Sequence, residues 1–153
     1  MDNDKTIVGK LETIKHIHKV RENLSKVIEL LDERARLHDL SKLESPEAEI
    51  FGEHTPELAK VEYGSDDYKK LLEKVKPAID HHYSKNRHHP EFHVNGINDM
   101  DLIDIIELLC DWKAATERNK NGNIRKSIEH NTGRYGMSEQ MAKIMQNTID
   151  RHF

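Results

Sequence analysis

The spacing of apolar residues in the first quarter of the chain admits little except α-helix. Between Thr6 and Leu37, apolar side chains recur at steps of three and four residues, at Ile14, Ile17, Val20, Leu24, Val27, Ile28 and Leu31. A period of 3.6 residues places such side chains on one face of a helix. This stretch is therefore predicted to be helical, in two pieces.

The same period returns from about Met100 to Glu117, where the apolar positions are Leu102, Ile103, Ile106, Leu109, Cys110 and Ala114. No part of the sequence shows the alternation of apolar and polar residues that is typical of a half-buried strand. We therefore expect an all-α fold of six to eight helices, organised as a single domain over residues 1–153.

Capping residues predict where the middle helices begin. Ser45-Pro46-Glu47 and Thr55-Pro56-Glu57 each combine a hydroxyl group, a Pro and an acidic residue in the order found at helix starts. Two short helices are expected from them. Gly64-Ser65 is expected to end one helix and cap another, which Pro77 kinks or restarts. The buried face of this next helix is predicted to carry Tyr68, Leu71, Leu72, Val75 and Ile79.

The remaining segments are shorter. Residues 84–98 have no helical period and are predicted to form a loop rich in His, which suits the mouth of a site. Residues 120–123 predict a turn. A short helix around residues 124–130 and a last helix from about Ser138 are expected to complete the chain.

Composition and charge exclude several functional classes. The formal net charge of −4 argues against binding to duplex nucleic acid, which requires a basic face. The single Cys110 permits no internal disulfide. Neither an apolar run of membrane-spanning length nor a signal peptide is recognisable. We therefore expect a cytoplasmic protein that does not associate with membranes.

Imidazole and carboxylate side chains are distributed in a way that predicts a metal site. His38-Asp39 places the two groups side by side near the end of the first apolar segment, and the other candidates are His16, His82, His88, His89 and Asp111. Nitrogen and oxygen ligands without a Cys favour a hard or borderline divalent metal over a zinc bound by thiolates. The expected cofactor is one or two ions of Mn, Co, Fe, Ni or Zn, with Mg also open.

Helical phase selects among neighbouring histidines. His16 lies on the flank of the apolar stripe, whereas His18 falls on the polar side, so His16 is the expected ligand. His82 follows Ile79 by three residues and is expected to point inward, whereas His81 is expected to face outward. A half-buried structural His remains the alternative reading of His16 and His18.

These motifs resemble the HD-domain superfamily of metal-dependent phosphohydrolases. The signature of that superfamily is a His, then a His-Asp pair, then a distant Asp, and the matching positions are His16, His38, Asp39 and Asp111. The segment 37–42 is similar to its His-Asp-x-x-Lys form. The motifs Asn86-x-His88-His89-Pro90-Glu91 and Cys110-Asp111-Trp112 look like a branch of small stand-alone proteins, some of them phage-borne. The resemblance covers about residues 14–119.

The resemblance implies an HD-like helical bundle with a metal site at its centre, on which residues 120–153 pack. It implies His16, His38, Asp39 and Asp111 as metal ligands, with Asp39 able to bridge a second ion. His82 and either His88 or His89 are then ligands of that ion or contacts of a phosphate. The implied activity is hydrolysis of a small phosphate ester by metal-activated water, with a nucleotide or deoxynucleotide as the preferred substrate, as in a 5′-nucleotidase. The expected location is the host cytoplasm if the chain is encoded by a phage.

Further side chains are expected around this site. The catalytic candidates are Asp39, Lys42 and Glu107, and the candidates for substrate contacts are Lys42, Tyr83, Asn86 and Arg87. Lys42 follows Asp39 by three residues and is expected on the same face if the helix continues that far, where its ammonium contacts the phosphate or the ligand carboxylate. A helix-capping cation is the alternative.

Glu107 is expected to support a ligand or act as a general base, with a solvated acidic face as the alternative. Trp112 is expected in the core rather than stacked on a base. Asn131, Arg134 and Tyr135 are candidates to close the pocket from the C-terminal side.

Two other functions fit the same residues. A His-rich diiron site that activates oxygen is known in some members of the superfamily. A metal-stabilised binding or regulatory module without catalysis is the non-enzymatic alternative, and a closed ligand shell favours it. The oligomeric state stays open, with a homodimer among the possibilities.

Overall fold

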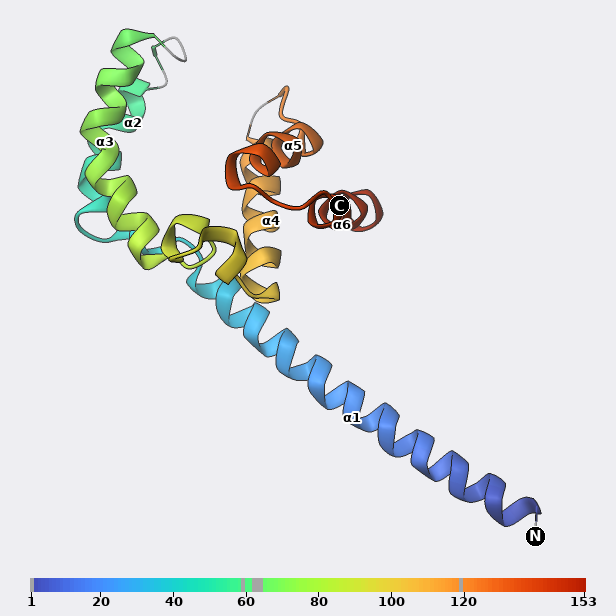
Figure 1. Cartoon of the computed structure of the whole chain (residues 1–153). Coiled ribbons are helices and arrows are strands. Elements are labelled where there is room, and N and C mark those ends of the chain that lie inside the picture. Colours follow the sequence, from blue (N-terminus) through green and yellow to red (C-terminus); the bar gives the residue numbers. More distant parts are fainter. Residues whose placement is uncertain (1, 59, 62–64, 119) are drawn as a thin grey trace. The chain divides into compact units, whose positions relative to one another are not determined.

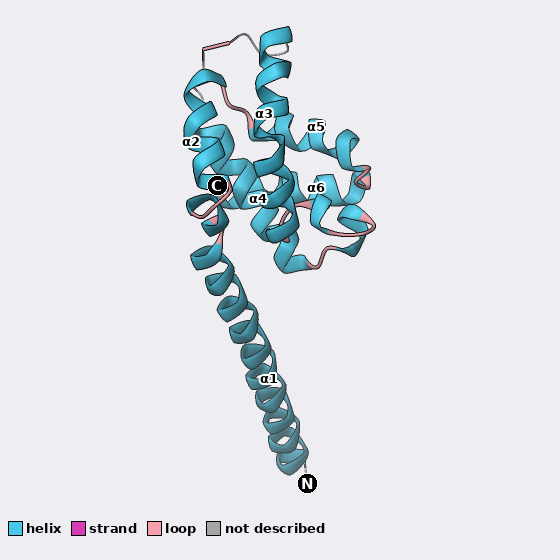
Figure 2. Ribbon diagram, turned by 90° about the vertical axis from the view of Figure 1, so that its left-hand side faces the viewer, coloured by secondary structure: helices cyan, strands magenta, loops and turns pink. Residues whose placement is uncertain are grey.

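The chain is built from helices, which confirms the expected all-α class. The structure, a computed structural model, describes residues 2–58, 60–61, 65–118 and 120–153, and no strand occurs in these residues (Figures 1 and 2). The α-helices are α1 Asp2–Leu37, α2 Glu47–Leu58, α3 Asp66–Lys85, α4 Leu102–Glu117, α5 Ile124–Tyr135 and α6 Glu139–His152. Three short 3₁₀ helices, η1 Leu40–Leu43, η2 Pro90–Phe92 and η3 Gly96–Asp99, lie between them.

The chain divides into two compact units, of which the first ends at Leu37 and the second runs from His38 to Phe153. The first unit is α1 alone, so the single-domain organisation stays a prediction. The expectation of two helical pieces was wrong, because α1 is one helix of 36 residues. Its sequence contains no Pro to interrupt the backbone hydrogen bonds.

Helix α2 corrects the prediction of two short helices. It begins at Glu47, as the Ser45-Pro46-Glu47 motif predicts, but it runs through Thr55 and Pro56 to Leu58. Pro56 therefore lies in the last turn of α2 instead of opening a new helix. Its ring removes one backbone donor close to a helix end, and α2 stops two residues later. Gly64 lies outside the described residues.

Helix α3 begins where predicted, because the Ser65 side chain accepts a hydrogen bond from the Tyr68 amide. Its buried residues are Leu71, Val75, Ala78 and His82. Leu72 is exposed, contrary to expectation, because one residue turns the helix by about 100° away from Leu71. Pro77 is accommodated within a single helix. In Figures 1 and 2 this helix runs beside α2, with which it makes the most extensive contact in the second unit.

The C-terminal helices share one core with α4. It contains Ile105, Leu108, Leu109, Trp112, Ile128, Met137, Met145 and Ile149. Trp112 is buried in this core, as predicted, and its ring lies parallel to that of Tyr135 with centroids 6.3 Å apart. Helix α5 runs five residues past the predicted end and stops at Gly136, which has the positive φ of 62° that Gly adopts easily.

Cap chemistry fixes the start of α4 and α6. Asp101 accepts backbone hydrogen bonds at the start of α4, and the Asp104 side chain reaches back to the Asp101 amide. Ser138 caps α6, as expected.

Among the described residues, no helix combines the length and the apolar composition needed to cross a membrane.

Candidate metal centre

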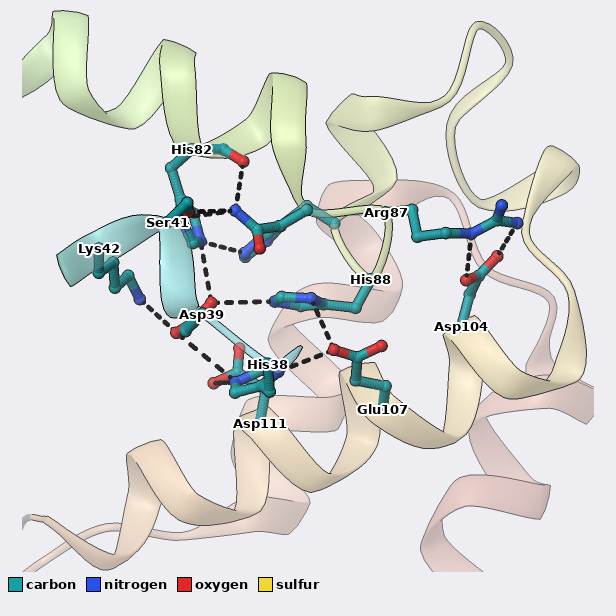
Figure 3. Close-up of polar contacts among 12 residues, drawn as sticks. His38, Asp39, Ser41, Lys42, His82, Arg87, His88, Asp104, Glu107 and Asp111 are labelled. Carbon is teal, nitrogen blue, oxygen red and sulfur yellow. Dashed lines mark hydrogen bonds and ion pairs between the residues drawn. The ribbon is translucent and has the colours of Figure 1, made fainter. Parts of the chain in front are cut away.

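The second unit gathers imidazole and carboxylate groups from four segments (Figure 3). His38 and Asp39 precede η1, His82 comes from the last turn of α3, and His88 and His89 come from the following loop. Glu107 and Asp111 face this cluster from α4, one turn apart, as their spacing predicts.

A left-handed residue brings the His-Asp pair into place. The backbone of Asp39 has φ 58°, a conformation that Asp and Asn tolerate better than most residues. The helix therefore does not continue through Lys42. The expectation that Lys42 lies on the same helical face as Asp39 depended on that continuation and is not met. Lys42 nevertheless reaches the same carboxylate, because η1 places its Nζ 2.6 Å from Asp39 Oδ2.

Two glutamates hold the histidines by their Nδ1 atoms. Glu107 Oε1 lies 2.8 Å from His38 Nδ1 and 3.1 Å from His88 Nδ1. Glu47, which is 0% exposed, places one oxygen 2.8 Å from His82 Nδ1 and the other 2.7 Å from His81 Nδ1. A carboxylate accepts a hydrogen bond, so each of these Nδ1 atoms carries a proton.

The opposite nitrogens of the His82 and His88 rings therefore turn lone pairs toward the same oxygen of Asp39. His82 Nε2 lies 3.2 Å and His88 Nε2 lies 3.6 Å from Asp39 Oδ1. His38 Nε2 lies 3.5 Å from the other oxygen of Asp39. His82 Nε2 also faces His89 Nε2 at 2.9 Å. Atoms that all present lone pairs at such distances repel one another unless a proton or a cation lies between them.

The donor set fits a divalent metal ion. Asp39 Oδ1 and His88 Nε2 are buried without a hydrogen-bond partner among the described residues, and such atoms are costly to bury. Three groups offer ligand atoms within 4.8 Å of one another, namely Asp39 with His82, His88 and His89; His38 with Asp39 and Asp111; and His38 with His88 and Glu107. Ring nitrogens fixed by carboxylates are the usual support of a metal-binding His.

Charges in the metal-free protein already suit cation binding, with one exception. Burial opposes ionisation of Asp39, but its contact with His82, the hydrogen bond from Lys42 and the positive charges of Lys42 and His38 hold the pKa of this carboxyl far below its usual range. Burial, reinforced by His88, lowers the pKa of His89 to about 3 and keeps the ring neutral. Hydrogen bonds to Asp111 and Glu107 raise the pKa of His38 to about 10, so this ring must release a proton to bind a metal.

Helical phase predicts the adjacent histidines of α3 only in part. His82 is 3% exposed and points inward, as expected. His81 is half-buried instead of facing fully outward, because its side chain bends to Glu47. His16 lies on α1, in the first unit, and its role as a ligand stays a prediction.

Two residues that were candidates for substrate contacts are occupied by the protein itself. The Arg87 guanidinium pairs with buried Asp104 through Nε at 2.8 Å and extends toward Asp101. The Asn86 amide donates to Ser41 Oγ and to the backbone oxygen of His82, each at 2.8 Å. Both residues thereby hold the His-containing loop against its neighbours.

Glu107 and Tyr83 behave differently from these two. The Glu107 side chain is mostly buried, which argues against a solvated acidic face, and its contacts with two rings favour a supporting role. The ring of Tyr83 lies 4.8 Å from that of His89, at the edge of a cavity of about 410 Å³ beside the cluster. Lys42, His82 and His89 line the same cavity.

Residues at the end of α5 also contact the loop that follows α3. Arg134 Nη2 and the Tyr135 hydroxyl both bond Glu91 Oε1, at 2.8 and 3.1 Å. They therefore hold the loop. Glu47 was assigned only to a helix start, and no sequence signal connects it with histidines 34 and 35 residues away.

A family model described as a family of unknown function (DUF5662) matches residues 8–151. The matched region includes every candidate metal-ligating residue named above. Comparisons with curated proteins and with solved structures gave no match.

Proposed function

The chain belongs to DUF5662, a family of unknown function, and from its site we propose that it is a metal-dependent phosphohydrolase that acts on a small phosphate ester. A nucleotide or deoxynucleotide is the preferred substrate. The HD-like identity of the fold is part of the same proposal. The observation that carries it is the convergence of unpartnered Asp39 Oδ1 and His88 Nε2 with two further imidazole nitrogens, next to an open cavity.

The ligand set supports one ion and leaves room for a second. The two oxygens of Asp39 face different groups, because Oδ1 lies near His82 and His88 whereas Oδ2 lies near His38. Asp111 Oδ1 lies 3.7 Å from His38 Nε2, on the side of the second group. Asp39 is thus the residue that would hold both ions.

The chemistry divides between the ion and the protein. Asp39, His82, His88 and His89 would hold a divalent ion. Such an ion would supply Lewis-acid chemistry, by polarising a phosphoryl oxygen and lowering the pKa of bound water from about 15.7 to about 7. Glu47 and Glu107 keep the Nδ1 protons of the histidines and so aim their lone pairs inward. The Lys42 ammonium, at the boundary of cluster and cavity, binds the phosphate oxygens.

The experiment is phosphate release under anaerobic conditions. With Mn²⁺, Co²⁺, Mg²⁺ or Ni²⁺, the protein should release inorganic phosphate from at least one nucleoside monophosphate or related ester, and oxygen should make no difference. Lys42→Ala should lower turnover while the metal stays bound, and exposed Lys74→Ala is the matched control. If no ester releases phosphate with any metal, whereas the iron-loaded protein consumes oxygen with an organic substrate, the hydrolase is the wrong reading and the diiron oxygenase replaces it.

A further inference from the structure

The cavity beside the metal centre is lined by two chemically different kinds of side chain. On the metal side it is lined by His82, His89 and Lys42. The lining also includes the apolar side chains of Phe51 on α2 and Ile79 on α3, the latter one turn before His82. Both are only half-buried, so the protein leaves apolar surface available to a ligand.

Arg118 adds a second cation to the lining of this cavity, beside Lys42. It directly follows α4 and lines the cavity. No hydrogen bond or ion pair joins its side chain to the described residues, in contrast to Arg87 and Arg134. Arg118 is seven residues after Asp111, which is two helical turns on the same face, or a rise of about 10 Å.

We propose that this cavity binds the alcohol part of a phosphomonoester, with Phe51 and Ile79 against an apolar or aromatic group and Arg118 near its far end. This inference rests on the proposed function. The phosphate lies at the metal side near Lys42, and the alcohol extends along α3 from His82 toward Ile79. A volume of about 410 Å³ lies in the range of pockets for small organic ligands.

The preferred substrates are therefore monophosphates whose alcohol part carries an apolar or aromatic group, which the base supplies in a nucleotide. Small alkyl phosphates fill only the metal side of the cavity and bind weakly. Triphosphates are disfavoured, because among the described residues Lys42 and Arg118 are the only Lys or Arg side chains that line the cavity. Two cations match the charge of one phosphate group better than that of three.

Binding is measured first with phosphonates, which cannot be hydrolysed. Isothermal titration of the metal-loaded protein should give at least tenfold tighter binding of benzylphosphonate than of ethylphosphonate, because only the former covers Phe51 and Ile79. Phe51→Ala should reduce this ratio to less than threefold. Phe153→Ala, which changes an exposed Phe at the C-terminus, should leave the ratio unchanged. Equal affinity for the two phosphonates would overturn the proposal, as would an unchanged ratio in Phe51→Ala.

Turnover separates this proposal from the proposed function. Benzyl phosphate and ethyl phosphate have similar leaving groups, so kcat/KM should follow the binding ratio, and Arg118→Ala should lower kcat/KM for a nucleoside monophosphate at least fivefold. Arg151→Ala on α6 is the matched control, because Arg151 does not line this cavity. Selective phosphonate binding without any hydrolysis would leave the pocket intact and reject the hydrolase. Hydrolysis that ignores both the benzyl group and Phe51 would reject the pocket alone.

Discussion

At the scale of single residues, the cluster depends on groups that do not themselves meet the metal. Glu47 is fully buried and bonds two histidines. Burial alone would raise the pKa of its carboxyl, but hydrogen bonds from His81, Ser41 and His82 outweigh this effect and lower the pKa. A buried carboxylate of this kind fixes the orientation of the ligand and raises its basicity. Its loss therefore changes the site without removing a ligand.

The first prediction concerns this glutamate. Glu47→Gln should weaken metal binding by about 10- to 100-fold, because the amide holds the His82 Nδ1 proton less well than a carboxylate does. Glu57→Gln, at an exposed position of the same helix, should leave the affinity unchanged. Competition with a chelator of known affinity measures both variants. Equal metal affinity in Glu47→Gln and the wild type would show that Glu47 only fills space.

A second residue-scale prediction separates His82 from His81. His82→Ala should remove one ligand and reduce metal occupancy strongly, whereas His81→Ala should reduce it mildly through Glu47. Elemental analysis of both variants, purified without a His tag, provides the comparison. Equal losses would mean that the two imidazoles contribute alike, against the burial of His82 and the partial exposure of His81.

At the scale of elements, sequence period predicted faces better than boundaries. Glu107 and Asp111 are four residues apart, a spacing that puts both side chains on one side of α4, and both face the cluster in the structure. The capping motif at Thr55-Pro56 wrongly predicted a new helix, because local cap chemistry cannot show whether the preceding helix has already ended. The sequence also did not predict the contact between Glu47 and His82. The two residues are 35 positions apart, and the packing of α2 on α3 brings them together.

The core shared by α4, α5 and α6 gives a prediction about stability. Ile128 is fully buried between these helices, so Ile128→Ala should lower the free energy of unfolding by about 2–5 kcal/mol. Ile144→Ala on exposed α6 surface should change it by less than about 0.5 kcal/mol. Urea unfolding followed by circular dichroism measures both. A small loss for Ile128→Ala would show that α5 does not share a cooperative core with α4.

At the scale of the whole molecule, metal binding is coupled to pH through His38. In the metal-free protein the carboxylates of Asp111 and Glu107 raise the pKa of His38 to about 10, from 6.5. The protonated ring therefore stabilises the metal-free fold below pH 6.5, and this contribution is lost as the pH rises toward 10. Metal binding requires the neutral ring.

The apparent metal affinity should consequently rise with pH up to about 10, by up to tenfold per pH unit for the single proton of His38. Titration calorimetry at pH 8 in two buffers of different ionisation enthalpy should detect one proton released from this ring on metal binding. In His38→Ala that proton should be missing. Affinity that is flat between pH 7 and 9 would show that His38 is not a ligand.

We infer that Asp39 organises a metal centre, and the metal content of untagged protein is the measurement that checks this. Wild-type protein should retain at least about one equivalent of a divalent transition metal after dialysis, whereas Asp39→Ala should retain almost none and stay helical by circular dichroism, because Asp39 belongs to two of the three groups of ligand atoms. Full metal occupancy in a folded Asp39→Ala protein would contradict the claim.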